Sequence, residues 1–238
     1  MLGLVVILLI SWGLLYLIEK KNLNALGLLP NGMHLGQFGL GLCLITLIGL
    51  MLIGTDTFVY SIDWQFFGPK FGLVLDAFVY HLRSALTEDL VFRGALLYIL
   101  ISRLGPHWGI LISALCFGMY HVFSYGILHE RAILIAYVIV VTGFTGSVWA
   151  FAFHKTRSIY LGLGLHVGYN MVMSCFYESQ PYGEMFYSEL SRVDLSESAQ
   201  SFYSILRGLF PSLMTLLVLI ALVRSGMIGS GSNNKAAE

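Results

Sequence analysis

Long apolar stretches separated by short polar segments run along almost the whole chain. A helix that crosses a bilayer needs about 20 mostly apolar residues. Backbone groups inside a bilayer must be hydrogen-bonded within the segment, which favours helices over other structures. The pattern predicts an all-α fold, a polytopic transmembrane helical bundle of about seven spans, at roughly 2–18, 36–54, 71–104, 107–124, 131–153, 158–176 and 208–224.

The third stretch is too long for one span. As a continuous helix it would extend about 51 Å, whereas the hydrocarbon core is near 30 Å thick. Its first half carries Asp76, His81 and Arg83. We therefore expect that half to be an interfacial or kinked piece, with the true span starting near Thr87. His81, His107, His129 and His154 lie near predicted span ends and are expected to be interfacial.

The chain shows no internal repeat and no domain boundary. We expect residues 1–228 to form a single integral membrane domain with a motif-bearing core at 70–176, followed by a flexible tail at 229–238. The apolar start lacks a basic region and a small-residue cleavage site, so we interpret it as a retained first span. Lysine and arginine favour one set of predicted loops, which places the C-terminus inside the cell.

The composition of the chain supports a membrane protein and argues against nucleic acid as a partner. The chain is 57% hydrophobic and 11% charged, whereas a soluble domain is about a quarter charged. Its net charge is zero, so no broad basic surface would recruit nucleic acid. The lipid bilayer is the expected environment, and a bacterial inner membrane is the expected location. The three cysteines, Cys43, Cys116 and Cys175, are expected to be free thiols.

Three polar clusters interrupt the predicted spans, where an ionisable side chain is costly and points to function. They read Glu88-Asp89-Leu-Val-Phe-Arg93, Phe117-Gly-Met-Tyr-His121 and His166-Val-Gly-Tyr-Asn170. Glu88 and His121 lie at nearly equal distances from a turn at Gly105-Pro106, so an antiparallel hairpin would bring them to one depth. His166 and Asn170 are four residues apart and project from one helix face.

The residue types in these clusters suit hydrolysis. Asp89 and Arg93 form an i,i+4 pair in the favourable order and can neutralise each other, which leaves Glu88 available on another face. A carboxylate beside a histidine is suited to activating water as a general base. A histidine and an asparagine facing the same cavity are suited to donating hydrogen bonds to an oxyanion.

The three motifs together resemble the CAAX protease and bacteriocin-processing enzyme family, also called Abi, whose patterns are EExxxR, FxxxH and HxxxN. The resemblance implies a glutamic intramembrane endopeptidase that uses no cofactor and no metal and cleaves a membrane-associated protein or peptide. It implies that Glu88 and His121 activate water, that His166 and Asn170 form the oxyanion site, and that Asp89 and Arg93 support the glutamate. Asp89 departs from the pattern, which has a second glutamate there.

Other functions also fit these residues. Each cluster alone is commonly structural: an ion pair, a packing histidine, or an amide that joins two helices. The same fold would serve a non-proteolytic scaffold or regulator. Buried charges also occur in transporters, although those are expected at several depths with repeated topology. Glu88, His121 and His166 are plausible zinc ligands, so a metalloprotease is a further alternative.

Overall fold

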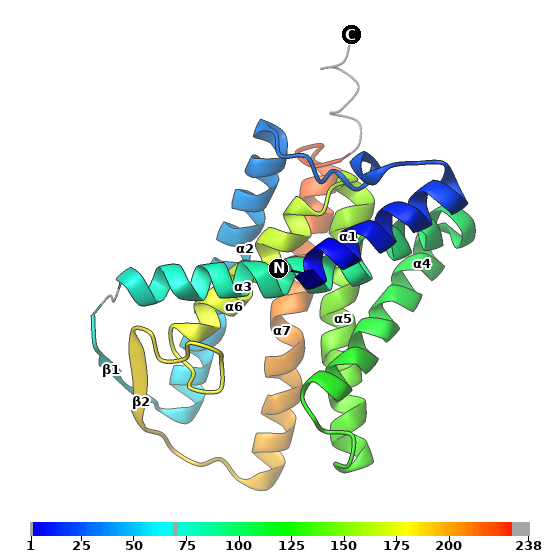
Figure 1. The fold of residues 1–238 in the computed structure, drawn as a ribbon. Helices are drawn as coiled ribbons and strands as arrows, with labels where there is room; N and C mark the ends of the chain where they lie inside the picture. The colour runs from blue at the N-terminus through cyan, green and yellow to red at the C-terminus, as the bar shows by residue number, and fades with distance from the viewer. Residues whose placement is uncertain (1, 69–70, 230–238) are drawn as a thin grey trace.

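The computed structural model describes residues 2–68 and 71–229, so most of the predicted tail lies outside the described residues. Seven α-helices account for most of this part of the chain (Figure 1). A π-helical turn, Leu15–Glu19, ends the first helix, and a 3-10 turn, Leu23–Leu26, follows it. The helices are α1 Leu2–Leu14, α2 Gly32–Tyr60, α3 Phe71–Phe92, α4 Ala95–Ser124, α5 Ala132–Thr156, α6 Tyr160–Ser174 and α7 Glu197–Arg224.

The helices run in two directions. In Figure 1, α2, α5 and α7 stand roughly upright, whereas α3 crosses in front of them almost at right angles. α3 packs against α1, α4 and α6, and α7 packs against α2 and α5. The all-α helical bundle predicted from the apolar pattern is confirmed. The cross-lying α3 is what brings the first polar motif against α4 and α6.

The number of spans differs from the expected seven. The described residues contain five helices long and apolar enough to cross a membrane, with Phe71–Ser124 taken as one segment. α6 falls short because 15 residues extend only about 22 Å, less than a hydrocarbon core of about 30 Å. A count of about seven is therefore not confirmed.

The break in the 71–104 stretch was predicted in the wrong place. α3 is one uninterrupted helix to Phe92, and the chain bends at 93–94. Gly94 is required at this bend, because a Cβ there would lie 2.2 Å from the carbonyl oxygen of Leu90. The hydroxyl of Ser113 donates to the carbonyl of Phe92 over 2.7 Å, which satisfies an acceptor at the helix end. The predicted turn at Gly105 is present, with φ of 79°.

α6 is the innermost helix. Eleven of its fifteen residues are buried, and it packs against α2, α3 and α5. A Cβ at Gly164 would lie 2.2 Å from the carbonyl oxygen of Phe38, and one at Gly168 would lie 2.9 Å from that of Leu42. These two glycines therefore allow the close approach of α6 to α2, whereas Gly162 has looser surroundings.

His81 is not interfacial as expected. It is 2% exposed, and its Nε2 lies 2.9 Å from the hydroxyl oxygen of Ser174. The prediction failed because α3 packs along α6, which buries a position that the apolar pattern placed near a span end. His107 and His129 are exposed, whereas His154 is half-buried.

A small β-hairpin lies beside the bundle and was not anticipated. β1 Asp63–Phe66 pairs antiparallel with β2 Tyr187–Ser191, and Trp64 faces Glu189. The segment 177–207, which joins the last two predicted spans, therefore contains a strand and the first turns of α7. The two strands lie at the lower left in Figure 1, at the end of α2.

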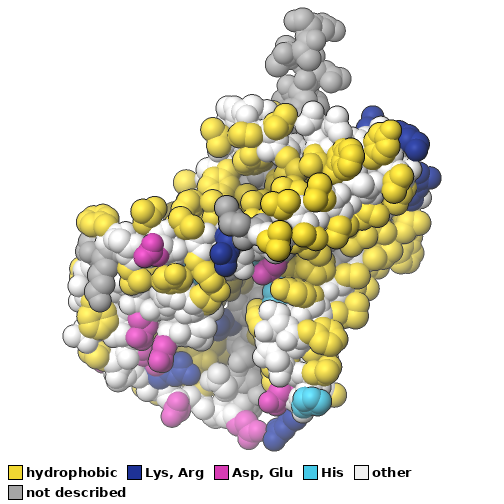
Figure 2. Space-filling model, viewed as in Figure 1, with side chains coloured by type: hydrophobic (Ala, Val, Ile, Leu, Met, Phe, Trp, Pro, Cys, Tyr) yellow, Lys and Arg dark blue, Asp and Glu magenta, His cyan; other side chains and the backbone are white. Residues whose placement is uncertain are grey.

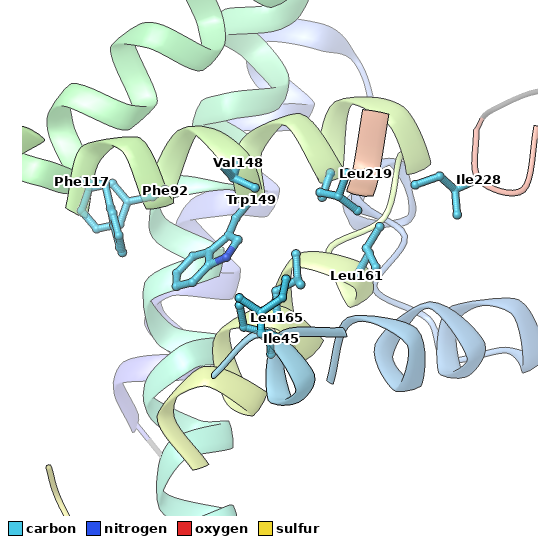
Figure 3. Close-up of a cluster of buried hydrophobic side chains, with 11 residues drawn as sticks. Ile45, Phe92, Phe117, Val148, Trp149, Leu161, Leu165, Leu219 and Ile228 are labelled. Carbon is cyan, nitrogen blue, oxygen red and sulfur yellow. The ribbon is translucent and has the colours of Figure 1, made fainter. Parts of the chain in front are cut away.

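The largest cluster of buried apolar side chains lies inside the helix bundle. Figure 3 shows Trp149 at its centre, with Phe92 and Phe117 on one side and Leu219 on the other. Outside, one face of the molecule is mainly hydrophobic, and most of its charged side chains gather toward its ends (Figure 2). An apolar surface of this kind matches a protein embedded in lipid.

Candidate active site

The glutamate of the first motif faces a histidine from each of the other two. Oε2 of Glu88 lies 4.0 Å from Nε2 of His121 and 3.8 Å from Nε2 of His166. These side chains come from α3, α4 and α6, so the fold brings together three motifs that are far apart in the sequence. Oε2 is buried and has no hydrogen-bond partner among the described residues. Unpaired buried oxygens are rare and call for an explanation.

The backbone fixes which nitrogen of His121 points at the glutamate. Nδ1 lies 2.9 Å from the carbonyl oxygen of Phe117, one helical turn earlier. A carbonyl only accepts, so Nδ1 carries the hydrogen in this bond. In the neutral ring Nε2 is then the unprotonated nitrogen, and it is the one directed at Glu88.

Asp89 and Arg93 form a buried ion pair beside these groups. Nη1 of Arg93 donates to Oδ1 of Asp89 over 2.9 Å, and each residue is 2% exposed. The same Oδ1 lies 3.4 Å from Nδ1 of His166, so the carboxylate contacts both the arginine and the histidine. Asp89 thus orients His166, whose other nitrogen faces Glu88.

Aromatic rings surround the guanidinium of Arg93. Its central carbon lies 3.8 Å from the ring centre of Phe117 and 4.9 Å from that of Trp149. A ring face attracts a cation, and the attraction is stronger where water is excluded. A Cβ at Gly146 would lie 2.8 Å from the Phe117 ring and 3.0 Å from Nη2 of Arg93, so this position holds no larger side chain without displacement. The phenylalanine of the second motif therefore supports the arginine of the first.

Asn170 lies with the two histidines on the wall of a cavity. The cavity has a volume of about 250 Å³ and lies between α4, α5, α6 and α7. His121, His166 and Asn170 all line it, and Asn170 is half-buried. Glu88 is not among the lining residues; its side chain is 18% exposed and lies behind the histidines. The histidines therefore form the boundary between the carboxylate and the cavity.

Two parts of this region were not foreseen from the sequence. Trp149 stacks on the ring of His166, with ring centres 4.3 Å apart and planes at 27°. The sequence carries no signal for this role, because the predicted span 131–153 ends only four residues after Trp149, where interfacial tryptophans are common. Arg207 of α7 also lines the cavity and pairs with Asp56 of α2. Residues 177–196, which precede α7, contribute no residue to the lining of this cavity.

Glu88, His121 and His166, the plausible zinc ligands, are not arranged as a metal site. Across residues 2–68 and 71–229, no group of three or more His, Cys, Asp or Glu side chains is arranged to hold a metal ion. The absence of a cofactor remains a prediction.

One comparison with known proteins finds a family that part of the chain resembles. Residues 70–172 match the family model described as type II CAAX prenyl endopeptidase Rce1-like. This part of the chain is therefore similar to that family. The match includes all three polar motifs, so the resemblance drawn from them is confirmed at the level of the family. No curated protein and no solved structure is similar enough to the chain to count as a match.

The family match gives the coarse function. The Rce1-like family supports an intramembrane CAAX endopeptidase, with a peptide substrate and a membrane setting. The apolar helices agree with an integral membrane protein.

Proposed function

We propose that this protein is a glutamic intramembrane endopeptidase in which Glu88 and His121 activate the hydrolytic water. The observation that carries the proposal is the buried Oε2 of Glu88, which faces Nε2 of both His121 and His166 at 3.8–4.0 Å. These separations are too long for direct hydrogen bonds. They suit one water molecule that bonds to the carboxylate and to a histidine at the same time.

The proposed residues have two tasks, the activation of water and the stabilisation of the oxyanion. Glu88 takes the proton of the water as it attacks the substrate carbonyl, and the unprotonated Nε2 of His121 holds the water in place. The carbonyl oxygen becomes an oxyanion, to which Asn170 and His166 on the cavity wall donate hydrogen bonds. Because Nδ1 of His166 donates to Asp89, His166 acts as a donor to the oxyanion through Nε2 with both ring nitrogens protonated. The proton then passes to the leaving amine, which breaks the peptide bond.

Asp89 and Arg93 have a supporting role in this proposal. Asp89 contacts Nδ1 of His166 and so holds the ring in the orientation that an oxyanion donor needs. Arg93 balances the charge of Asp89, and its aromatic surroundings fix the guanidinium. Aspartate in place of the family's second glutamate is therefore compatible with activity, because the ion pair with Arg93 is short.

Purified protein in detergent tests the assignment with a quenched prenyl-cysteine CAAX peptide. We expect Glu88→Gln to lower kcat/KM by about 10²–10⁴-fold, the usual contribution of a general base. Glu130→Gln, an exposed glutamate between α4 and α5, is the matched control and should keep full activity. The losses from Glu88→Gln and His121→Ala should not multiply in the double variant, because both residues act on one water.

Multiplicative losses would count against a shared water. Full cellular function in Glu88→Ala would favour a non-proteolytic scaffold. In cells, the termini of membrane and secreted proteins should differ between wild type and Glu88→Gln, and the new termini would identify the natural substrate.

A further inference from the structure

The cavity next to the proposed catalytic group contains a cation that the reaction does not use. Besides His121 and Asn170 it is bordered by hydroxyl side chains of α5 and α7, and two of these, Thr145 and Ser212, hydrogen-bond across the helix interface over 2.6 Å. Arg207 is the one lysine or arginine among the described residues that line it. In Figure 1 the helices α5 and α7 stand side by side in the middle of the bundle.

Arg207 is held in a fixed position by a buried acid. Its Nε donates to both carboxylate oxygens of Asp56, over 2.9 Å and 3.1 Å. Asp56 is 2% exposed and also accepts hydrogen bonds from the hydroxyls of Tyr177 and Tyr203. One acid, two tyrosines and the arginine thus join α2, the end of α6 and α7.

Asp56 engages only part of the guanidinium, which also interacts with Tyr177 and lies 5.1 Å from the centre of its ring. The bonds to Asp56 use Nε, and the two terminal amino groups are not engaged by that carboxylate. The Arg207 side chain is 36% exposed, whereas its partner Asp56 is almost completely buried. The terminal groups are the pair that binds carboxylates in a parallel, two-pronged geometry.

Arg207 and Asn170 border the same cavity. A peptide bound in that cavity can therefore contact the arginine and the proposed oxyanion site at the same time.

We propose that Arg207 binds the C-terminal carboxylate of the peptide substrate in this cavity. The proposal rests on the proposed endopeptidase function and adds the residue that selects the substrate terminus. The ligand is an anion on a peptide; a lipid phosphate has related chemistry, and the test separates the two.

The experiment measures binding, so it does not depend on catalysis. A fluorescent prenyl-cysteine peptide is made with either a free carboxylate or a carboxamide at its end. Both are titrated into the Glu88→Gln protein in nanodiscs of zwitterionic lipid. We expect the acid to bind at least about tenfold more tightly than the amide, as a charge-assisted pair of hydrogen bonds implies.

Variants then assign that preference to one residue. Removing Arg207 alone would leave the buried carboxylate of Asp56 unpaired, so the main variant is Asp56→Asn/Arg207→Gln in the same background. It should bind acid and amide equally. Asp56→Asn alone retains the arginine and should keep the preference. Arg207→Lys, which leaves a cation for Asp56, should keep part of it.

Arg192 provides the matched control. It borders a neighbouring cavity, and its guanidinium lies 4.9 Å from the ring centre of Tyr60. Arg192→Gln should leave the preference unchanged. Equal binding of acid and amide to the parent protein would overturn the proposal, as would a preference that survives the double variant or disappears with Arg192→Gln.

Repeating the titration in nanodiscs with anionic lipid distinguishes the source of the anion. A preference that is present only without anionic lipid would assign Arg207 to a headgroup phosphate and also overturn the proposal. Cleavage of the acid peptide by wild type but not by Glu88→Gln is measured separately. Loss of that activity difference would reject the proposed function. The binding experiment would still test the role of Arg207 independently.

Discussion

Arg93→Met is expected to destabilise the protein far more than the loss of a surface charge would. The substitution leaves the Asp89 carboxylate, which is 2% exposed, without its cation. Removing one partner of a buried ion pair costs about 3–5 kcal/mol, because a charge remains in a region of low polarity. Methionine is long and apolar and fills much of the space between Phe117 and Trp149, so the expected loss of about 3–5 kcal/mol reports mainly the unpaired carboxylate.

The double variant Asp89→Leu/Arg93→Met tests this explanation. Replacing both partners of a buried pair by apolar residues is often nearly neutral, so most of the lost stability should return. The free energy of unfolding is measured in detergent for wild type, Asp89→Leu, Arg93→Met and the double variant. Arg103→Met is the control, because it breaks an exposed pair with Glu19 and should cost less than about 1 kcal/mol.

Two outcomes would refute the reasoning. Equal destabilisation of Arg93→Met and the double variant would mean that Arg93 stabilises the protein through its aromatic contacts and not by balancing the charge of Asp89. If Arg93→Met cost no more than Arg103→Met, the pair would not be closed off from water as the structure indicates.

Three further predictions follow from the site and its support. Asp89→Asn should lower kcat/KM less than Glu88→Gln if Asp89 only orients a histidine and balances an arginine; equal and complete losses in the peptide assay would make it a catalytic partner. Chelators should leave the activity of the purified enzyme unchanged, and zinc in stoichiometric amount that is lost together with activity would support a metalloprotease. Gly164→Leu should prevent α6 from approaching α2 and lower the thermal midpoint in detergent, whereas Gly54→Leu, where a Cβ meets no atom within 4 Å, should not.

Local spacing was enough to predict one contact of the site. Four residues separate Asp89 from Arg93, and that distance along a helix made the ion pair predictable. Glu88 and His121 were expected at one depth because they are equally far from the Gly105 turn, and the two side chains do face each other. However, Glu88 lies on α3, before the bend at 93–94 and outside that hairpin, so its contact with His121 depends on the packing of α3 against α4.

Features that depend on distant segments were not predicted. The partners Asp56 and Arg207 are 151 residues apart, and nothing in the local pattern connects them. The β-hairpin joins residues 63–66 to 187–191, and its strands are too short to show a clear alternation. The bend after Phe92 depends on the close contact between Gly94 and Leu90, which an apolar profile does not reveal.

The burial of α6 has a consequence for how the protein is made. Two of the proposed catalytic residues, His166 and Asn170, lie on a helix that is too short to cross the membrane alone and is enclosed by α2, α3 and α5. Longer segments such as α2 and α5 can enter the bilayer individually during synthesis, whereas α6 gains its environment only when they assemble around it. We therefore expect proteolytic competence to arise late in biogenesis, after insertion is complete, so that an incompletely assembled chain carries the motifs without the activity.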